Sequence, residues 1–302
     1  MPKPYSIGVD LGGTNLRVAL VSRKGEVLKK IKEPSTGDIF ESLKKAIQTL
    51  ITPEVEGVGI GVAGVVDRKE KKVIVSPNLP QINGMNFKEL GLRLPLYVEN
   101  DANAAALGEA TMGAGKDYQS FVMLTLGTGV GGGIIYKGKL LAVAAEIGHM
   151  SIAADGEKCF CGNIGCLELY CSARAIIGAA TRALEGGAES SLRELTQGNI
   201  YRVTTEDVYK AAMEGDNLSR EVLKNAGKYL GVGIANVINI MSPDAVILSG
   251  GLLGAWNIYI EEAIREAGKR AFKSLFQKVS IIPAVLGEEA GIVGAASLVF
   301  QS

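Results

Sequence analysis

Apolar runs that end in glycine turns recur along this chain, and they predict strands that alternate with helices. The segment at 6–21, SIGVDLGGTNLRVALV, places two apolar runs around a glycine turn, which is typical of a β-hairpin. In the first half, strand-like runs follow at 55–66 and 96–101, and helical patterns at 38–50 and 102–113. Asp38 is the expected N-cap of the first helix, and Gly113 is expected to end the second.

The pattern of the N-terminus is repeated near residue 120. The segment at 121–141, FVMLTLGTGVGGGIIYKGKLL, again predicts strand, glycine turn and strand. Its residues Thr125–Gly129 align with Asp10–Thr14 of the first hairpin. Two similar hairpins in one chain indicate an ancient duplication, with one hairpin opening each half.

The second half is richer in helical patterns. Helical spacing is found at 172–184, 205–214 and 217–241, the last ending ahead of Pro243. A buried-type strand, a Gly-Gly turn and a helix start follow at 244–256, then a short strand VSIIPA and a final apolar helix at 288–300. Alternating strands and helices predict an α/β fold with a mixed sheet in each of two lobes.

The duplication also predicts the domain boundaries. We expect a small α/β lobe made of 1–114 together with 288–302, and a large α/β lobe made of 115–287. The small lobe would carry the first hairpin, and the large lobe would carry the second hairpin and the later Gly-Gly turn.

Composition excludes several classes of function. The 302 residues are 47% hydrophobic and carry 32 basic and 32 acidic side chains, which is typical of a globular protein and gives no basic stripe for nucleic acid. The N-terminus MPKPYSIGVD lacks the apolar core of a signal peptide, and no apolar run is long enough to span a membrane. We therefore expect a cytoplasmic protein, whose cysteines stay reduced, with no nucleic-acid or membrane partner.

The glycine turns indicate phosphate binding. In GVDLGGTN at 8–15, glycine amides can turn toward an anion, Thr14 and Asn15 add donors, and Asp10 can hold Mg²⁺. The alternative is a plain glycine turn with an exposed Asp. GTGVGG at 127–132 fits a dinucleotide fingerprint, but a strand rather than a helix is expected to follow it, so we interpret it as a second phosphate hairpin. LSGG at 248–251 would be a third such turn.

These three glycine turns resemble the ATPase core shared by sugar kinases, actin and heat-shock ATPases. PNLPQINGMNF at 77–87 and VENDANAAALGEA at 98–110 resemble the sugar-contacting region of the ROK family. EIGHMSI at 146–152 with CFCGNIGCLELYCS at 159–172 is similar to that family's signature of E-x-G-H and C-x-C-G-x-x-G-C-x-E. The resemblance covers essentially the whole chain and implies a two-lobed actin-like, hexokinase-type fold with duplicated ribonuclease H-like lobes.

The resemblance implies a role for individual residues. Asp101 matches the catalytic base. The alternative is that it is the N-cap of the helix that follows, a role that could also accompany catalysis. The residues that match the sugar-binding set are Asn100, Glu146, His149 and Glu168, with Gly64 and Asn78 as weaker matches. Glu146 and Glu168 could alternatively be plain surface acids. The nucleotide-binding set is Asp10, Gly12, Gly13, Thr14, Asn15, Gly127, Thr128, Gly129, Gly250 and Gly251.

The single histidine and three of the four cysteines lie within 149–166. His149, Cys159, Cys161 and Cys166 offer one nitrogen and three thiolates, a closed tetrahedral set for structural zinc. One imidazole nitrogen could bind zinc while the other meets a sugar hydroxyl. An iron–sulfur cluster is the alternative, but it usually needs four thiolates. The remaining cysteine, Cys171, is interpreted as a core thiol.

The resemblance implies ATP-dependent phosphorylation of a hexose at its 6-hydroxyl, and glucose is favoured because PNLPQING resembles the ROK members that act on glucose. Fructose, mannose, N-acetylglucosamine and N-acetylmannosamine are alternatives within the ROK family. A sugar-sensing regulator is a further alternative, but the family's regulators carry a helix-turn-helix ahead of the first hairpin, for which the five residues before Ser6 leave no room. The family resemblance also implies a homodimer or higher homo-oligomer.

Overall fold

The computed structural model describes residues 3–77 and 79–301. They divide into two compact units, each treated by itself below. Unit 1 comprises Met1–Met123, Gly133–Ala145 and Ala284–Ser302, and unit 2 comprises Leu124–Gly132 and Glu146–Pro283.

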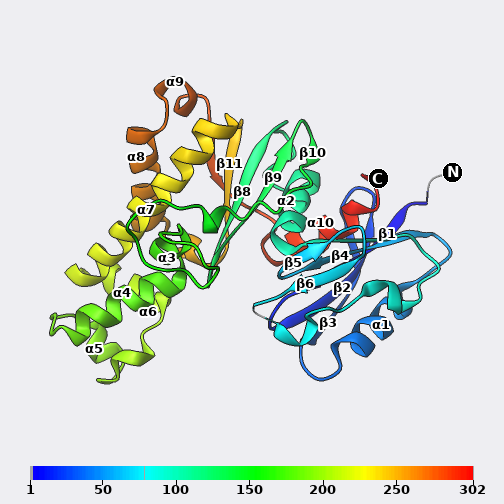
Figure 1. Cartoon of the computed structure of the whole chain (residues 1–302), viewed down its shortest axis with the longest axis horizontal. Coiled ribbons are helices and arrows are strands. Elements are labelled where there is room, and N and C mark those ends of the chain that lie inside the picture. The colour runs from blue at the N-terminus through cyan, green and yellow to red at the C-terminus, as the bar shows by residue number, and fades with distance from the viewer. Residues whose placement is uncertain (1–2, 78, 302) are drawn as a thin grey trace. The chain divides into compact units, whose positions relative to one another are not determined.

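The N-terminal sheet of unit 1 has the strand order β3-β2-β1-β4-β7 (Figure 1). Its strands are β1 (Tyr5–Leu11), β2 (Asn15–Ser22), β3 (Val27–Pro34), β4 (Val55–Val62) and β7 (Leu96–Asn100). The first three strands pair antiparallel, whereas β1, β4 and β7 are parallel. A separate two-stranded ribbon joins β5 (Val65–Asp67) to β6 (Lys72–Val75).

A second five-stranded sheet has the order β10-β9-β8-β11-β12. Its strands are β8 (Phe121–Leu126), β9 (Val130–Tyr136), β10 (Lys139–Leu140), β11 (Ala245–Ser249) and β12 (Ser280–Pro283). Here β9 pairs antiparallel with β10, as β2 does with β3 in the first sheet. The strands β11 and β12 are parallel, as β4 and β7 are in the first sheet. The same order of pairing in both sheets agrees with the duplication predicted from the two glycine hairpins.

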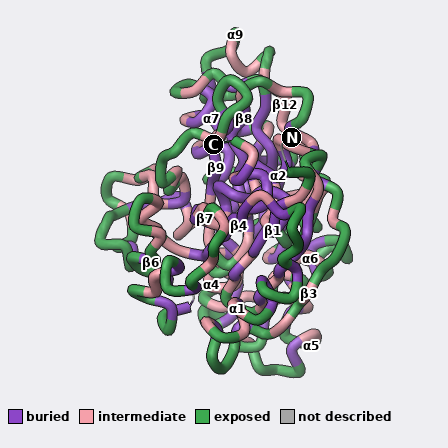
Figure 2. Tube along the Cα trace, turned by 90° about the vertical axis from the view of Figure 1, so that its right-hand side faces the viewer, coloured by how far each residue is buried: buried purple, intermediate pink, exposed green. Residues whose placement is uncertain are grey.

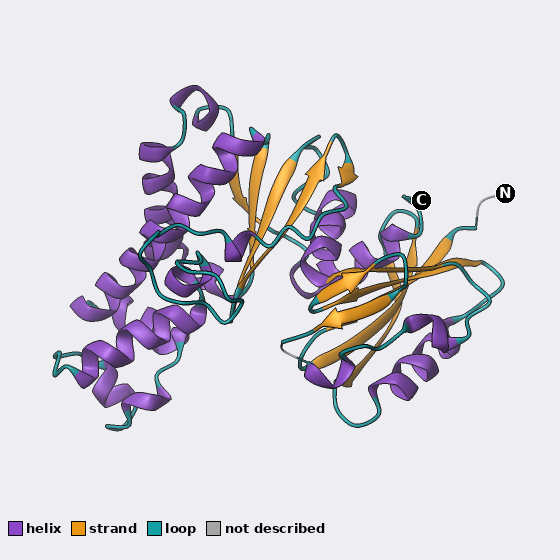
Figure 3. Ribbon diagram, viewed as in Figure 1, coloured by secondary structure: helices purple, strands orange, loops and turns teal. Residues whose placement is uncertain are grey.

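Helices account for most of the remaining chain, especially within 168–276 (Figure 3). The α-helices are α1 (Ile39–Leu50), α2 (Asp101–Met112), α3 (Glu168–Cys171), α4 (Ala173–Glu185), α5 (Leu192–Leu195), α6 (Thr205–Met213), α7 (Asn217–Met241), α8 (Glu261–Arg270), α9 (Lys273–Phe276) and α10 (Ala290–Leu298). Short 3-10 turns occur at η1 (Pro80–Ile82), η2 (Phe87–Leu90), η3 (Ile147–His149), η4 (Ile200–Arg202), η5 (Gly251–Ala255) and η7 (Gly287–Glu289), and a π-helical turn at η6 (Trp256–Ile260). No helix within the described residues is long and apolar enough to cross a membrane.

Most of these elements agree with the sequence pattern, and Asp38 is the N-cap of α1, accepting a hydrogen bond from the Glu41 amide. The expected strand at 55–66 is interrupted, because β4 ends at Val62 and β5 starts at Val65. Gly64 causes the break: its φ is +135°, and a Cβ there would lie 2.4 Å from the Val75 carbonyl oxygen. The break places the Gly64 backbone at the carboxyl end of the parallel strands.

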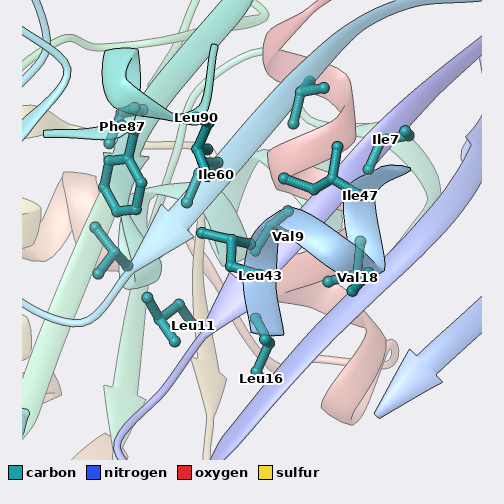
Figure 4. Packing of buried hydrophobic residues seen from close by; sticks show 14 of the residues in the cluster. Ile7, Val9, Leu11, Leu16, Val18, Leu43, Ile47, Ile60, Phe87 and Leu90 are labelled. Carbon is teal, nitrogen blue, oxygen red and sulfur yellow. The ribbon is translucent and has the colours of Figure 1, made fainter. Parts of the chain in front are cut away.

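The core of unit 1 lies on both faces of its sheet. On one face, Leu43 and Ile47 of α1 pack against buried residues of β1 and β4, such as Val9 and Ile60 (Figure 4). On the other face, Ile292 and Ala296 of α10 pack against β2. Both faces of the central strands are therefore covered, and β1 and β4 are accordingly buried along most of their length (Figure 2).

Glycines in the central strands allow α10 to approach the sheet closely. A Cβ on Gly59 would lie 1.8 Å from the Ala295 carbonyl oxygen, so Gly59→Ala forces α10 off the sheet. We expect the substitution to lower the free energy of unfolding by about 3 kcal/mol, the upper part of the range for overpacked cores. Denaturant unfolding measures this loss of stability. The control is Gly254→Ala, because nothing lies within 4 Å of the Cβ added there. Equal midpoints for both variants would contradict the close packing.

Candidate functional site

The turn between β1 and β2 is held by its own backbone and by Ser35. The Gly12 amide donates to the Asn15 carbonyl at 3.1 Å, and the Ser35 hydroxyl donates to the Gly12 carbonyl at 2.7 Å. The Ser35 amide donates to the Thr14 carbonyl at 3.0 Å. These bonds use the carbonyl oxygens of the turn, and Gly13 and Thr14 stay exposed, so the turn presents donors to solvent as an anion site requires.

Asp10 stands at the end of β1, beside this turn. Arg17 donates to its carboxylate at 2.9 Å, and the Asp10 side chain is only 14% exposed. Burial raises the pKa of Asp10, and the neighbouring Arg17 opposes the shift. A buried carboxylate at a phosphate-type turn is a suitable ligand for a hard divalent cation, whose charge would favour the ionised form.

The start of α2 brings together three of the predicted site residues. The Asn100 side-chain oxygen accepts hydrogen bonds from the Ala102 and Asn103 amides, and its Nδ2 donates to the Gly64 carbonyl at 3.0 Å. Asp101 occupies the first helical position, where its carboxylate accepts from the Ala102 amide at 2.9 Å. The alternative role of Asp101 as N-cap is therefore wrong, because Asn100 is the N-cap. Asn78 lies outside the described residues.

In unit 2 the second glycine turn joins β8 to β9. The Gly127 amide donates to the Gly129 carbonyl at 3.0 Å, and the Ala173 amide of α4 donates to the Gly127 carbonyl at 2.8 Å. A strand, not a helix, follows the turn, so a dinucleotide fingerprint is excluded as expected. Gly250, with φ +101°, packs against the Leu126 carbonyl, where a Cβ would come within 2.2 Å, so the third glycine turn lies against the second hairpin.

Both halves of the E-x-G-H and cysteine signature meet at Val130. The Glu168 carboxylate accepts a hydrogen bond from the Val130 amide at 2.8 Å. Gly148 lies against the Val130 carbonyl, because a Cβ there would come within 2.0 Å of that oxygen. Glu168 is half-buried and hydrogen-bonded to the second hairpin, whereas Glu146, the N-cap residue before η3, is exposed. Glu168 is therefore more than a plain surface acid, and for Glu146 that alternative stays open.

The single histidine and three cysteines form a compact cluster. The ligand atoms of His149, Cys159, Cys161 and Cys166 all lie within 4.8 Å of one another. His149 Nδ1 is 3.7 Å from Cys159 Sγ, and Cys161 Sγ is 3.7 Å from Cys166 Sγ. Sulfurs bound to one tetrahedral zinc at about 2.3 Å would stand about 3.8 Å apart, so the cluster fits such an ion. Since Nδ1 faces the thiols, Nε2 points away from them.

The loop around the cluster is fixed by a second layer of hydrogen bonds. Asn163 Nδ2 donates to the His149 carbonyl at 3.0 Å and to Cys166 Sγ at 3.4 Å. Burial, with the neighbouring thiols, raises the pKa of Cys166 to about 12, so metal binding would displace its proton. Cys171 is fully buried outside the cluster, and its thiol donates to the Leu167 carbonyl.

Sequence comparison places this arrangement in a family, since the ROK family model matches residues 6–302. The chain belongs to the ROK family. It is 35% identical to the glucokinase of Streptomyces coelicolor, covering 97% of this chain and 96% of that protein. It is 30% identical to the xylose repressor of Caldicellulosiruptor bescii, covering 98% of this chain and 78% of the repressor. The ROK family thus includes both kinases and regulators among relatives of this chain.

Comparison with solved structures agrees with the assignment to the ROK family. The crystal structure of a ROK family glucokinase from Streptomyces griseus, in complex with glucose and AMPPNP, superposes with a TM-score of 0.82 and 32% identity, covering 99% of this chain and 100% of that chain. The chain therefore has the actin-like, hexokinase-type α/β fold that the resemblance implied. Its predicted site residues are divided between the units: Asp10 to Asn15, Gly64, Asn100 and Asp101 in unit 1, and the others, apart from Asn78, in unit 2.

Sequence reasoning missed one group of residues beside this site. Arg68, Glu99 and Asn103 form a network next to Asn100. Glu99 and Asn103 fall within VENDANAAALGEA, but no role was expected for either of them or for Arg68. A signal was present, since Glu99 is an acid within the apolar strand LYVEN, where a buried charge requires a partner. The partner, Arg68, is 31 residues away, and no local pattern identifies it.

Proposed function

We propose that this ROK protein is an ATP-dependent hexose kinase that transfers the γ-phosphoryl group of ATP to the 6-hydroxyl of glucose. The full-length match to curated glucokinases carries the proposal, since those relatives are 35% identical over nearly the whole chain. The ROK glucokinase whose structure holds glucose and AMPPNP supports both substrates. Zinc, magnesium and the roles of individual residues are finer parts of the same proposal.

In this proposal Asp101 accepts the proton of the attacking hydroxyl. Phosphoryl transfer needs mainly positioning and charge stabilisation, and a placed carboxylate adds about 10²–10⁴-fold. The N-terminus of α2, capped by Asn100, holds Asp101 rigidly. Asn100, Gly64, Glu146, His149 and Glu168 would bind sugar hydroxyls, and Asn78 is assigned to this set from the sequence alone.

The nucleotide would be bound by the glycine turns. The amides of Gly13 and Gly129 would face phosphate oxygens, whereas Gly12 and Gly127 would shape the turns, since their amides donate to the Asn15 and Gly129 carbonyls. Thr14, Asn15 and Thr128 would add side-chain donors, and Gly250 and Gly251 would lie against the nucleoside. Asp10 would hold Mg²⁺, which screens phosphate charge when bound. Arg17 already donates to Asp10 Oδ2, which fixes the carboxylate in one orientation.

The Cys₃His cluster would hold structural zinc. Four protein ligands close the tetrahedron and leave no position for substrate, so the ion would fix the 149–168 loop rather than take part in the reaction. With Nδ1 facing the thiols, Nε2 of His149 would be available to a sugar hydroxyl. Cytoplasmic location and a homodimer or higher oligomer stay predictions from the sequence.

A substrate panel tests the activity. With Mg-ATP we expect glucose to give glucose 6-phosphate with the highest kcat/KM among glucose, mannose, fructose, N-acetylglucosamine and N-acetylmannosamine. Coupled ADP detection measures each rate, and replacing ATP by polyphosphate tests the donor. A preference for another sugar would overturn glucose as substrate, and no turnover on any of them would overturn the kinase proposal in favour of a sugar-binding regulator.

A further inference from the structure

The Glu99 side chain, at the end of β7, is the centre of a hydrogen-bond network in unit 1. Arg68 donates two hydrogen bonds to its carboxylate, from Nε at 2.5 Å and from Nη2 at 2.7 Å. The same carboxylate accepts from the Asn100 amide at 2.8 Å and from Asn103 Nδ2 at 3.0 Å. The Glu99 side chain is only 4% exposed. The bidentate ion pair with Arg68 and the two further donors therefore compensate the cost of burying the Glu99 charge.

The network has a second end at the Val143 carbonyl. Arg68 Nη2 donates to this oxygen at 2.9 Å, and Asn103 Nδ2 also donates to it at 2.9 Å. Residues 141–144 are exposed, so apolar burial does little to fix this loop. The loop also contains Ala145 at φ +50°, a conformation that is unfavourable for a residue with a Cβ. Glu146 follows directly.

We propose that Arg68, Glu99 and Asn103 are positioning residues for the phosphoryl transfer. They fix the backbone at Asn100 and Asp101 through one end of the network, and the loop that leads to Glu146 through the other. The inference rests on the proposed function, because it uses the roles assigned to Asp101 and Glu146. None of the three side chains has to touch a substrate for this.

The chemistry of the network explains its residue types. Only a guanidinium can donate two parallel bonds to one carboxylate and a third to a carbonyl, since an ammonium is a single point of charge. Asn103 bridges Glu99 and Val143 with the two hydrogens of one amide nitrogen, and its Oδ1 is buried without a partner among the described residues. Leaving that acceptor unpaired costs stability. This cost indicates that Asn103 is placed for its hydrogen bonds to Glu99 and Val143 rather than for packing.

Two variants separate positioning from folding. Arg68→Lys keeps the charge beside Glu99 but loses the forked geometry, and Asn103→Ala keeps the ion pair but removes one donor to Val143. The matched control is Arg23→Lys: Arg23 is also in unit 1, also pairs with a glutamate, Glu56, and is 37% exposed, close to the 33% of Arg68. Circular dichroism and thermal melts would establish that each variant is folded at the assay temperature.

We expect kcat/KM for glucose to fall about 10²-fold in Arg68→Lys and Asn103→Ala, the loss typical of a reacting group displaced by about 1 Å. The KM for ATP should stay within about twofold, because the network lies outside the glycine turns. Hydrogen exchange at 141–146 should become faster in both variants. Arg23→Lys should match the wild type in all three measurements.

The outcomes decide between the explanations. A lower melting temperature with wild-type kinetics and wild-type exchange in both variants would mean that the network only stabilises the fold, which overturns the inference. An equal rise of the ATP and glucose KM values would also overturn it. If the wild type phosphorylates no hexose, the proposed function fails by itself, and the exchange measurement alone decides whether the network holds the 141–146 loop.

Discussion

Asp101→Asn is expected to lower kcat about 10²–10⁴-fold, the contribution of a well-placed general base. Asparagine has nearly the same shape, and its side-chain oxygen can still accept the hydrogen bond from the Ala102 amide that Asp101 accepts now at 2.9 Å. The start of α2 should therefore stay intact, because Asn100 remains its N-cap. Steady-state kinetics should show the loss in kcat, with the glucose and ATP dissociation constants close to wild type.

Asp38→Asn is the matched control for this experiment. Asp38 also lies at a helix N-terminus in unit 1 and also accepts a backbone hydrogen bond, from Glu41, but it has no proposed role in the reaction. Asparagine and aspartate cap helices about equally well, so this variant should keep full activity. A kcat within about tenfold of wild type for Asp101→Asn would remove Asp101 from the role of base.

The local elements were predictable because their signals lie within a few residues. The N-cap Asp38, the glycine turns at 12–14 and 127–129, and the end of α2 before Gly113 each follow from side-chain chemistry next to the element. The strands β1 and β8 are buried apolar runs, which the pattern marks directly. The cysteine cluster was predictable for the same reason, since three of its ligands lie within 159–166.

Elements and contacts that depend on distant partners were not predictable. In β3, VLKKIKEP, Val27 and Ile31 are only half-buried and Leu28 is exposed, so the strand exists because β2 offers an edge to pair with. A helix start was expected within 244–256, but no pattern predicted that helix α8 extends over Glu261–Arg270. The Arg68–Glu99 pair joins residues far apart in the sequence, and the contact of Glu168 with Val130 spans 38 residues. Such pairs become visible only after the chain is folded.

The contacts of Val130 show how the two signature segments act together. One residue of the second hairpin, Val130, donates its amide to the Glu168 carboxylate and has Gly148 packed against its carbonyl. Glu168 lies two residues after Cys166, and Gly148 directly precedes His149. A shift of the cysteine loop would therefore move both Glu168 and His149 relative to the hairpin. The loop is the part of unit 2 where a structural metal would matter most.

Cys161→Ser is therefore expected to abolish stoichiometric zinc binding and to weaken glucose binding more than ATP binding. The serine hydroxyl is a poor zinc ligand, and three remaining ligands leave the tetrahedron open. If free zinc exceeds its dissociation constant about 1,000-fold, losing the site removes about 4 kcal/mol of stability. Zinc content by mass spectrometry of metals should fall from about one per chain to near zero, as expected for a lost structural site. The KM for glucose should rise about tenfold while the KM for ATP changes less, because His149 and Glu168 lie on the loop.

Cys171→Ala supplies the control, because Cys171 is the fourth cysteine and lies outside the cluster, fully buried. Its thiol donates to the Leu167 carbonyl and lies beside the Tyr259 hydroxyl, away from the cluster, so the variant should lose some packing but keep its zinc and its glucose KM. Comparing Cys171→Ala with Cys161→Ser separates the effect of losing a cysteine from the effect of losing a zinc ligand. A verified zinc-free Cys161→Ser protein that binds glucose as the wild type does would show that the loop holds its shape without metal, since the Asn163 bonds to His149 and Cys166 would then be enough to fix it.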